Sequence, residues 1–232
     1  MYDELKKRVF EANLQLVEYG LVILTFGNVS QIDREKGFMA IKPSGVAYKQ
    51  MQPADMVVLD LNGRVVEGSL RPSSDAPTHL HLYRFWPDIG GIAHAHSDFA
   101  TSFAQAGAEI PVLGTTQADF CPGPVPVTRQ LIEEEVNSDY ELNTGRIIVE
   151  RFRLLDPAHF PACLVSGHGP FAWGKSAQEA VDNLLHLEKI ARMAAITRLI
   201  NPETEELKNY LIKKHFARKH GPQAYYGQRK EK

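Results

Sequence analysis

The chain has 232 residues, 44% of them hydrophobic, which is enough for one large domain over residues 1–232 with a substantial core. Its net charge of −2 and its dispersed Lys and Arg residues argue against a nucleic-acid partner, because phosphate contacts need clustered basic side chains. No apolar run approaches the roughly 20 residues that span a bilayer. The two cysteines are too few for a disulfide framework, and the N-terminus lacks the apolar core of a signal peptide. We expect a cytoplasmic protein with no membrane partner.

The first part of the chain predicts one helix followed by strands. Apolar residues recur at helical spacing from Leu5 to Leu16, and Gly20 follows at the stop position. Segment 21–33 predicts an apolar strand, a Gly-Asn turn and a second strand. Segment 38–42 predicts a third strand, and PSG at 43–45 a turn.

Later segments add a hairpin and several helices. The Asn62-Gly63 pair between apolar segments 56–61 and 64–66 is the strongest short hairpin signal in the chain. Helices are expected at about 76–86, 97–106, 128–136, 176–200 and 203–219. Ser176 and Glu179 form a capping box at the start of the longest one. Hairpins among helices indicate an α/β fold in which an antiparallel central sheet is layered between helices.

The stretch GGIAHAH at 90–96 reads as a buried strand that ends in metal ligands. His94 and His96 are two residues apart, so on a strand their side chains share one face. Catalytic zinc keeps three protein ligands and an open position, and His168, between glycines in SGHGP, is the best third candidate. The alternative is that all three are ordinary core or loop histidines.

The other histidines have no such pattern. His79 and His81 lie in a predicted helix, where residues two apart are separated by about 200° around the axis and cannot share an ion. His159, His186 and His220 have no visible partner and receive no role.

Three short turns carry hydroxyl and amide side chains that resemble an anion cradle. They are GNVS at 27–30, KPSG at 42–45 and RPSSD at 71–75. The third turn precedes a helix, whose free N–H groups and dipole favour a phosphate beside Ser73 and Ser74, and Lys42 adds a positive charge. Each turn taken singly is more simply just a turn.

Further polar residues have two interpretations each. Asp75 is equally compatible with capping the following helix and with a role in catalysis. Asp119 lies in a Pro- and Gly-rich loop, where an Asp is usually solvated. Tyr225 and Tyr226 lie near the end of the chain, and their simplest role is packing against the body.

Together these motifs resemble the class II aldolase and aldose-ketose epimerase family, and within it the epimerases. The likeness runs from Leu5 to Gln228. It rests on TFGNVS, IKPSG, RPSSDAPTH, GGIAHAHS, GTTQAD, GHGPFAWGK and RKHGPQAYYGQ. The resemblance implies that His94, His96 and His168 bind a catalytic divalent ion, Zn²⁺ or another such as Mn²⁺ or Co²⁺. It also implies that the substrate phosphate is held by Asn28, Lys42, Ser44, Gly45, Ser73 and Ser74.

The resemblance also assigns the proton carriers. Position 75 lies beside the metal and is typically Glu in the aldolases, whereas here it is Asp, as in the epimerases. Asp119 and Tyr226 match the pair that moves protons, which in the family comes from the neighbouring subunit of a fourfold ring. Further polar residues of that shared site are matched by Thr115, Arg218 and His215. Gln117 departs from the pattern, since a His often precedes the Ala-Asp pair, and RKEK extends the tail.

The resemblance therefore implies a homotetrameric, metal-dependent isomerase that acts on a phosphorylated pentulose. The chain has no GxGxxG after a strand, which argues against a nicotinamide or flavin. Cleavage and re-formation of C3–C4 can invert C4 without such a cofactor. Two alternatives stay open, a metal-dependent aldolase acting on a ketose 1-phosphate and a non-catalytic domain like the adducin head.

Overall fold

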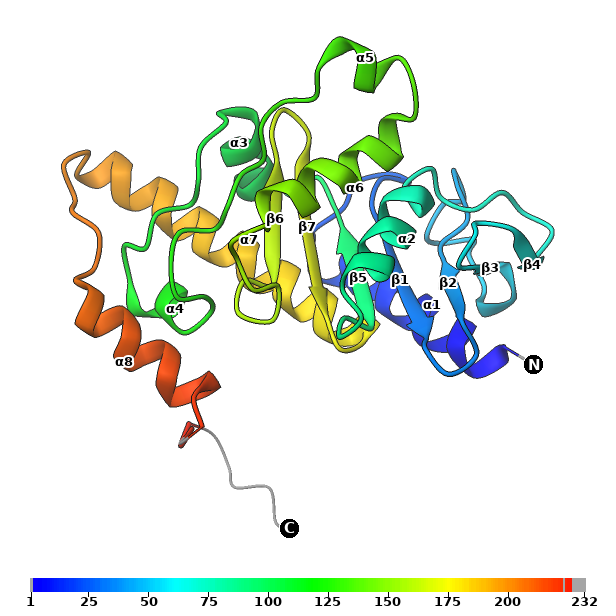
Figure 1. The fold of residues 1–232 in the computed structure, drawn as a ribbon, viewed down its shortest axis with the longest axis horizontal. Helices are drawn as coiled ribbons and strands as arrows, with labels where there is room; N and C mark the ends of the chain where they lie inside the picture. The colour runs from blue at the N-terminus through cyan, green and yellow to red at the C-terminus, as the bar shows by residue number, and fades with distance from the viewer. Residues whose placement is uncertain (1, 223, 227–232) are drawn as a thin grey trace.

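One sheet of seven strands forms the centre of the computed structural model, which describes residues 2–222 and 224–226 (Figure 1). The strands lie in the order β4-β3-β2-β1-β5-β7-β6, and every neighbouring pair is antiparallel. Their bounds are Asn28–Asp33 for β1, Phe38–Ile41 for β2, Val57–Asp60 for β3, Val65–Glu67 for β4, Gly91–His94 for β5, Ala162–Val165 for β6 and Gly169–Gly174 for β7. The antiparallel central sheet expected from the hairpins is confirmed.

Helices cover both faces of the sheet. Their bounds are Asp3–Glu18 for α1, Ala76–Phe85 for α2, Asp98–Gln105 for α3, Thr115–Ala118 for α4, Glu133–Val136 for α5, Tyr140–Arg151 for α6, Ala177–Ile200 for α7 and Asn209–His220 for α8, with a short 3-10 turn at Pro53–Asp55. Apolar residues of α1, α3 and α7 form one core with the sheet, and those of α2 and α6 form a second core on the other face. The result is three layers, as predicted.

Strand β5 lies in the middle of this arrangement, between β1 and β7. Its residues alternate between the two cores: Ile92 packs with α2 and α6, whereas Ala93 packs with α1, α3 and α7. The strand begins with Gly91 because a Cβ there would lie 2.2 Å from the Ser176 carbonyl oxygen. The glycine thus lets the strand pass under the start of α7. The other end of the strand, away from this contact, carries His94.

The apolar strand predicted at 21–26 is wrong. The chain turns there instead of pairing with the sheet, Leu24 has a positive φ of 53°, and Ile23 and Leu24 are 65% and 79% exposed. The pairing positions on both sides of β1, the strand that follows this segment in the chain, are already taken by β2 and β5. An apolar run without alternation could not reveal this, because pattern alone does not show which edges are occupied.

Two helix predictions also need correction. Of the segment 128–136 only Glu133–Val136 is helical, and the helix expected from residue 203 begins at Asn209. Helix α6 at Tyr140–Arg151 was not predicted at all, although it packs closely on α2. No helix within the described residues is long and apolar enough to cross a membrane.

Candidate metal centre

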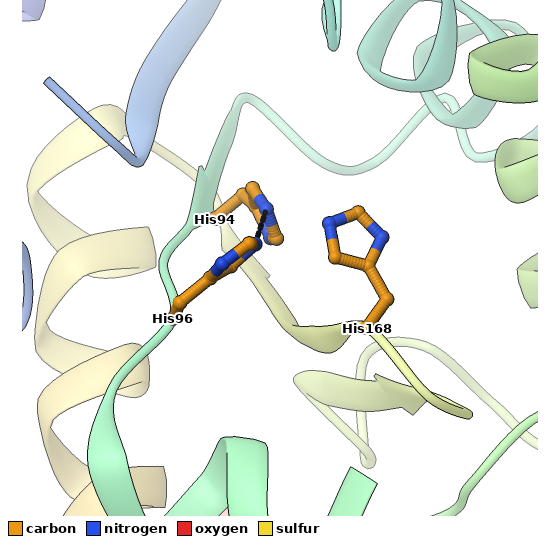
Figure 2. Close-up of side chains that lie close together, drawn as sticks. All are labelled: His94, His96 and His168. Atoms are coloured by element: carbon orange, nitrogen blue, oxygen red, sulfur yellow. Dashed lines mark hydrogen bonds between the residues drawn. The ribbon is translucent and has the colours of Figure 1, made fainter. Parts of the chain in front are cut away.

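Three histidines, two from the end of a strand and one from the turn of a neighbouring hairpin, converge on one point (Figure 2). His94 is the last residue of β5, His96 follows in the loop before α3, and His168 lies in the turn that joins β6 to β7. One nitrogen from each ring lies within 4.8 Å of the others. Pairing of β5 with β7 brings these ends together, since His94 lies opposite Phe171 in that ladder.

Hydrogen bonds orient the rings so that their Nε2 atoms can face one another. The Nδ1–H of His94 donates to the Pro170 carbonyl oxygen at 2.8 Å, and this leaves its Nε2 free. The Nε2 atoms of His94 and His96 are 3.2 Å apart. Figure 2 shows the His168 ring turning one nitrogen toward the other two. Three imidazoles with converging nitrogens match the donor set of a catalytic zinc site, so these residues fit a divalent ion.

Burial favours the neutral, metal-binding form of two of these histidines, His96 and His168. Desolvation lowers the pKa of His168 to about 4, with further lowering from His94 and His96. Desolvation also lowers the pKa of His96. Neutral imidazole is the ligand form, so the centre is prepared to bind an ion at neutral pH.

The chain after His96 is held from a different helix. The Glu188 carboxylate on α7 accepts the backbone N–H groups of Phe99 and Ala100, each at 2.9 Å. These are N–H groups of the first turn of α3, which have no partner within the helix itself. His96, the second candidate ligand, therefore lies between a strand end and a capped helix start.

Asp75 faces the metal centre and does not cap α2. It occupies the N-cap position, yet its side chain makes no capping hydrogen bond. Its Oδ2 accepts from Asn28 Nδ2 at 2.6 Å, and Asn28 lies opposite His94 in the ladder between β1 and β5. Burial acts to raise the pKa of Asp75, but the nearby His94 and His79 and the Asn28 bond outweigh it, and the pKa lies below its ordinary value. Of the two roles predicted for Asp75, the geometry favours one beside the histidines over capping of α2.

A cavity of about 360 Å³ joins the histidines to the three polar turns. The sequence-predicted residues on its wall are Asn28, Lys42, Ser44, Gly45, Ser73, Ser74, Asp75, His94, His96 and His168. Backbone bonds from Ser44 N to Arg71 O and from Ser73 N to Lys42 O tie two of the turns together. Because these bonds use the N–H groups of Ser44 and Ser73, the turns would offer an anion mainly hydroxyl groups and the remaining N–H groups.

Lys42 is a buried cation in this wall. Its Nζ donates to the carbonyl oxygens of Thr25 and Pro43 at 3.2 and 3.4 Å, and it lies 4.8 Å from the centre of the Tyr48 ring. Within the described residues it forms no ion pair. Burial lowers the pKa of Lys42 to about 8. A buried ammonium group without a carboxylate partner is costly unless an anion binds beside it.

The predicted proton carriers lie elsewhere in the chain. Asp119 ends α4, and its carboxylate accepts from Arg218 Nε at 2.9 Å, from Arg218 Nη2 and from His215 Nδ1 at 3.1 Å, both on α8. Burial acts to raise the pKa of Asp119, but the bonds from Arg218 and His215 lower it overall. None of these residues lines the cavity beside the histidines, and Figure 1 shows α4 and α8 together at one end of the molecule, away from β1 and β2.

Tyr226 and Thr115 belong to this second group. The Tyr226 ring lies over Arg218 and Lys219, with 4.9 and 4.8 Å from each cation to the ring centre. The Tyr226 side chain thus packs on α8 as expected for the tail, but it stays 60% exposed and is not buried in the core. Thr115 begins α4 and is exposed. One chain therefore carries two separate groups of candidate residues.

Several residues near these groups were missed or left without a role. Tyr140 and Glu141, at the start of α6, line the cavity with the histidines, and Phe26 stacks on His96 with ring centres 6.1 Å apart. His220 was given no partner, yet its Nε2 bonds the Asp119 carbonyl oxygen at 2.9 Å. A Ser-Asp pair before Tyr140 is a helix-start signal that could have indicated α6.

The predicted helical pair does not form part of the centre. His79 is fully buried, its Nδ1 bonds Ser30 Oγ at 2.7 Å, and burial lowers its pKa to about 3. His81 instead lies against Phe85, with ring centres 4.7 Å apart and the ring planes tilted by 37°. Among the described residues, the group of His, Cys, Asp and Glu that could hold a metal ion is the trio of His94, His96 and His168.

Comparison with known proteins finds solved structures with the same fold and a family model that matches most of the chain. The fold matches an L-fuculose 1-phosphate aldolase with a TM-score of 0.79 and 28% identity, over 93% of this chain and 95% of the other. It also matches L-fuculose 1-phosphate aldolases from Glaciozyma antarctica (TM-score 0.76, 19% identity, 96% and 84% covered) and Thermus thermophilus (TM-score 0.65, 24% identity, 88% and 98% covered). Residues 7–195 match the model of the class II aldolase and adducin N-terminal domain. This protein therefore belongs to the class II aldolase and adducin N-terminal domain family.

Proposed function

We propose that this protein is a metal-dependent 4-epimerase that interconverts L-ribulose 5-phosphate and D-xylulose 5-phosphate. The observation that carries the proposal is the cavity of about 360 Å³ in which three convergent histidines, Asp75 and the unpaired cation of Lys42 face one space. The cavity has a set of possible metal ligands at one end and a buried lysine that can bind an anion at the other, which suits a small phosphorylated sugar.

The chemistry of C4 inversion explains why a phosphate cradle is needed. The C4 hydrogen is not α to the C2 carbonyl, so inversion requires that another bond, C3–C4, breaks and re-forms. A divalent ion at the histidines, with zinc as our proposal, would act as a Lewis acid that stabilises negative charge on the C1–C3 fragment. The cradle of Lys42, Ser44 and Ser74 would hold the glycolaldehyde phosphate fragment by its phosphate while its aldehyde rotates to present the other face.

Each aldehyde face needs its own proton carrier. We assign these roles to Asp119 and Tyr226, supported by Thr115, His215 and Arg218. The two groups of residues are separate within one chain, so a complete site requires the second group from a neighbouring copy. A ring of four chains that share their sites between neighbours would meet this requirement.

An aldolase that cleaves a ketose 1-phosphate is the second candidate. The observation that favours it is the 28% identity to an L-fuculose 1-phosphate aldolase over 93% of the chain. Asp at position 75, where the aldolases of the family typically have Glu, favours the epimerase. A non-catalytic role like that of an adducin head is disfavoured by the intact trio of converging histidines.

One assay separates these candidates. Zinc-loaded protein is incubated with L-ribulose 5-phosphate and, in a parallel reaction, with L-fuculose 1-phosphate, and the products are followed by NMR. We expect D-xylulose 5-phosphate to accumulate without release of free fragments. Release of dihydroxyacetone phosphate from L-fuculose 1-phosphate, with no conversion of the pentulose, would establish the aldolase instead, and no turnover of either sugar would leave the non-catalytic role.

Lys42 predicts a pH dependence. Its pKa of about 8 means that the ammonium group is charged below pH 8 and neutral above it. We therefore expect kcat/KM for the phosphorylated sugar to fall above pH 8, approaching tenfold per pH unit, because the neutral amine loses its attraction for phosphate. Lys42→Met should lower kcat/KM at pH 7 by about 10- to 100-fold and flatten this fall. The interpretation fails if kcat/KM of Lys42→Met falls above pH 8 as steeply as that of the wild type. Unphosphorylated L-ribulose serves as the control substrate.

A further inference from the structure

Tyr140 begins α6 and lies beside the third histidine of the metal centre. Its hydroxyl oxygen is 3.4 Å from His168 Nδ1, and the two ring centres are 6.2 Å apart. Tyr140 lines the cavity that contains Lys42, and it also lines a second cavity of about 440 Å³ beside α3. His96 and His168 line both cavities as well. Tyr140 therefore lies at the junction of the two cavities, next to the metal ligands.

The start of α6 is held firmly in this place by α2. Thr78 Oγ1 donates to the Glu141 carbonyl oxygen at 2.5 Å, one residue beyond Tyr140. Further along, a Cβ added to Gly145 would lie only 3.0 Å from the Cβ of His81, so the two helices are in close contact there. The helix that carries Tyr140 is thus braced against the helix that begins beside Asp75, and Tyr140 has little freedom to move away from His168.

The contact has a chemical consequence for the ligand. A neutral imidazole that offers Nε2 to a metal carries its hydrogen on Nδ1, and that N–H needs an acceptor. In His94 the acceptor is the Pro170 carbonyl oxygen at 2.8 Å. In His168 the polar atom found near Nδ1 is the Tyr140 hydroxyl oxygen.

We infer that Tyr140 is a positioning residue for the metal ligand His168. Its hydroxyl oxygen accepts the Nδ1–H of His168, which fixes the tautomer and the ring orientation that present Nε2 to the ion. The inference rests on the metal centre of the proposed function and not on which sugar is turned over.

A phenol hydroxyl can accept from His168 and at the same time donate its O–H into the cavity that Tyr140 lines.

The test is metal affinity in Tyr140→Phe, which removes the hydroxyl oxygen and keeps the ring. We expect the zinc dissociation constant, measured by competition with a chelating indicator, to rise about 10- to 100-fold, as for other partners of metal-bound histidines. The absorption spectrum of the cobalt-loaded protein should change as well. Tyr210→Phe, on the exposed face of α8, is the matched control and should bind zinc like the wild type. Equal thermal unfolding midpoints without metal would show that both variants are folded.

A pair of backgrounds tests whether Tyr140 acts through His168. Adding Tyr140→Phe to His168→Asn should cause no further loss of affinity, whereas adding it to His96→Asn should weaken binding by the same factor as in the wild type. Wild-type protein that binds no zinc would overturn the proposed function. Wild-type protein that binds zinc while folded Tyr140→Phe binds it equally well, or an equal additional loss in both backgrounds, would overturn this inference alone.

Discussion

Replacing His96 with Asn is expected to remove both bound metal and activity. The proposed site has three histidines with nitrogens that converge within 4.8 Å, so the loss of one leaves two histidines that would hold an ion poorly. Loss of a partner outside the ligand set already costs roughly 10- to 100-fold in affinity, and loss of a ligand should cost more than about 100-fold. Because Lewis acidity contributes several kcal/mol, kcat should fall by about 1000-fold or more.

The measurement combines metal analysis of purified protein with turnover before and after chelation. His159→Asn is the control, because His159 is exposed and lies outside the metal centre. The His159 ring lies beside that of Phe216, with ring centres 5.3 Å apart. It should keep about one divalent ion per chain, as expected for a single three-ligand site. Full turnover by His96→Asn, or by wild-type protein after exhaustive chelation, would show that the histidines do not serve catalysis through a metal.

Replacing Tyr226 with Phe is expected to stop epimerisation while the metal centre stays intact. A positioned general acid or base contributes about 10²- to 10⁴-fold, and the epimerase needs one on each aldehyde face. Tyr226 contacts Arg218 and Lys219 and does not line the cavity of the histidines. The variant should therefore bind zinc normally and retain slow aldol addition of dihydroxyacetone to glycolaldehyde phosphate, which uses one face only. Zinc content and both reactions are measured on the same preparation.

Mixed oligomers test whether Tyr226 acts on a neighbouring chain. His96→Asn chains keep a good Tyr226, and Tyr226→Phe chains keep a good metal centre. If sites are shared, a 1:1 reassembled mixture should regain about a quarter of wild-type activity, because each half of a site comes from the right chain half of the time. Hybrids confirmed by native mass spectrometry that remain inactive would show that Tyr226 acts within its own chain or not at all.

A second mixture gives an independent answer. Chains carrying both His96→Asn and Tyr226→Phe are reassembled 1:1 with wild-type chains. Shared sites predict about a quarter of full activity, whereas sites contained in one chain predict about a half, since every wild-type chain would then be active. Shared sites predict about a quarter of full activity in both mixtures. Agreement between the two values would therefore distinguish shared sites from a loss of activity caused by incomplete reassembly.

Local patterns were sufficient for the parts of the fold whose geometry depends on neighbouring residues. The two-residue spacing of His94 and His96 after a Gly pair indicated a strand end, and the structure has β5 ending at His94. The Asn62-Gly63 pair indicated the hairpin of β3 and β4. Half of the predicted capping box at the start of α7 is present, with Ser176 Oγ accepting from Glu179 N, whereas the Glu179 carboxylate accepts from Lys175 N instead of Ser176 N. In each case the alternation of a strand, the φ angles of a turn or the free N–H groups of a helix start limit the choice of residue.

Local patterns failed where distant parts of the chain decide. Segment 21–26 is as apolar as a strand, but β2 and β5 already occupy both sides of β1. Helix α6 was overlooked because its stability depends on packing against α2, which a window of sequence does not contain. Tyr140 was missed with it, because its proximity to His168 follows from that packing and from no spacing in the sequence.

The sequence by itself therefore determined the antiparallel sheet, the helices α1, α2, α3 and α7 and the histidines that could hold a metal, because each depends on periodicity or on residue chemistry. Only the tertiary structure decided that Asp75 turns to Asn28 and the metal centre instead of capping its helix. It also decided that Asp119 and its partners on α8 lie apart from the histidines. The physical reason is that a hydrogen bond or an ion pair between residues 47 or 99 positions apart in the chain depends on how the layers pack, which no local pattern specifies.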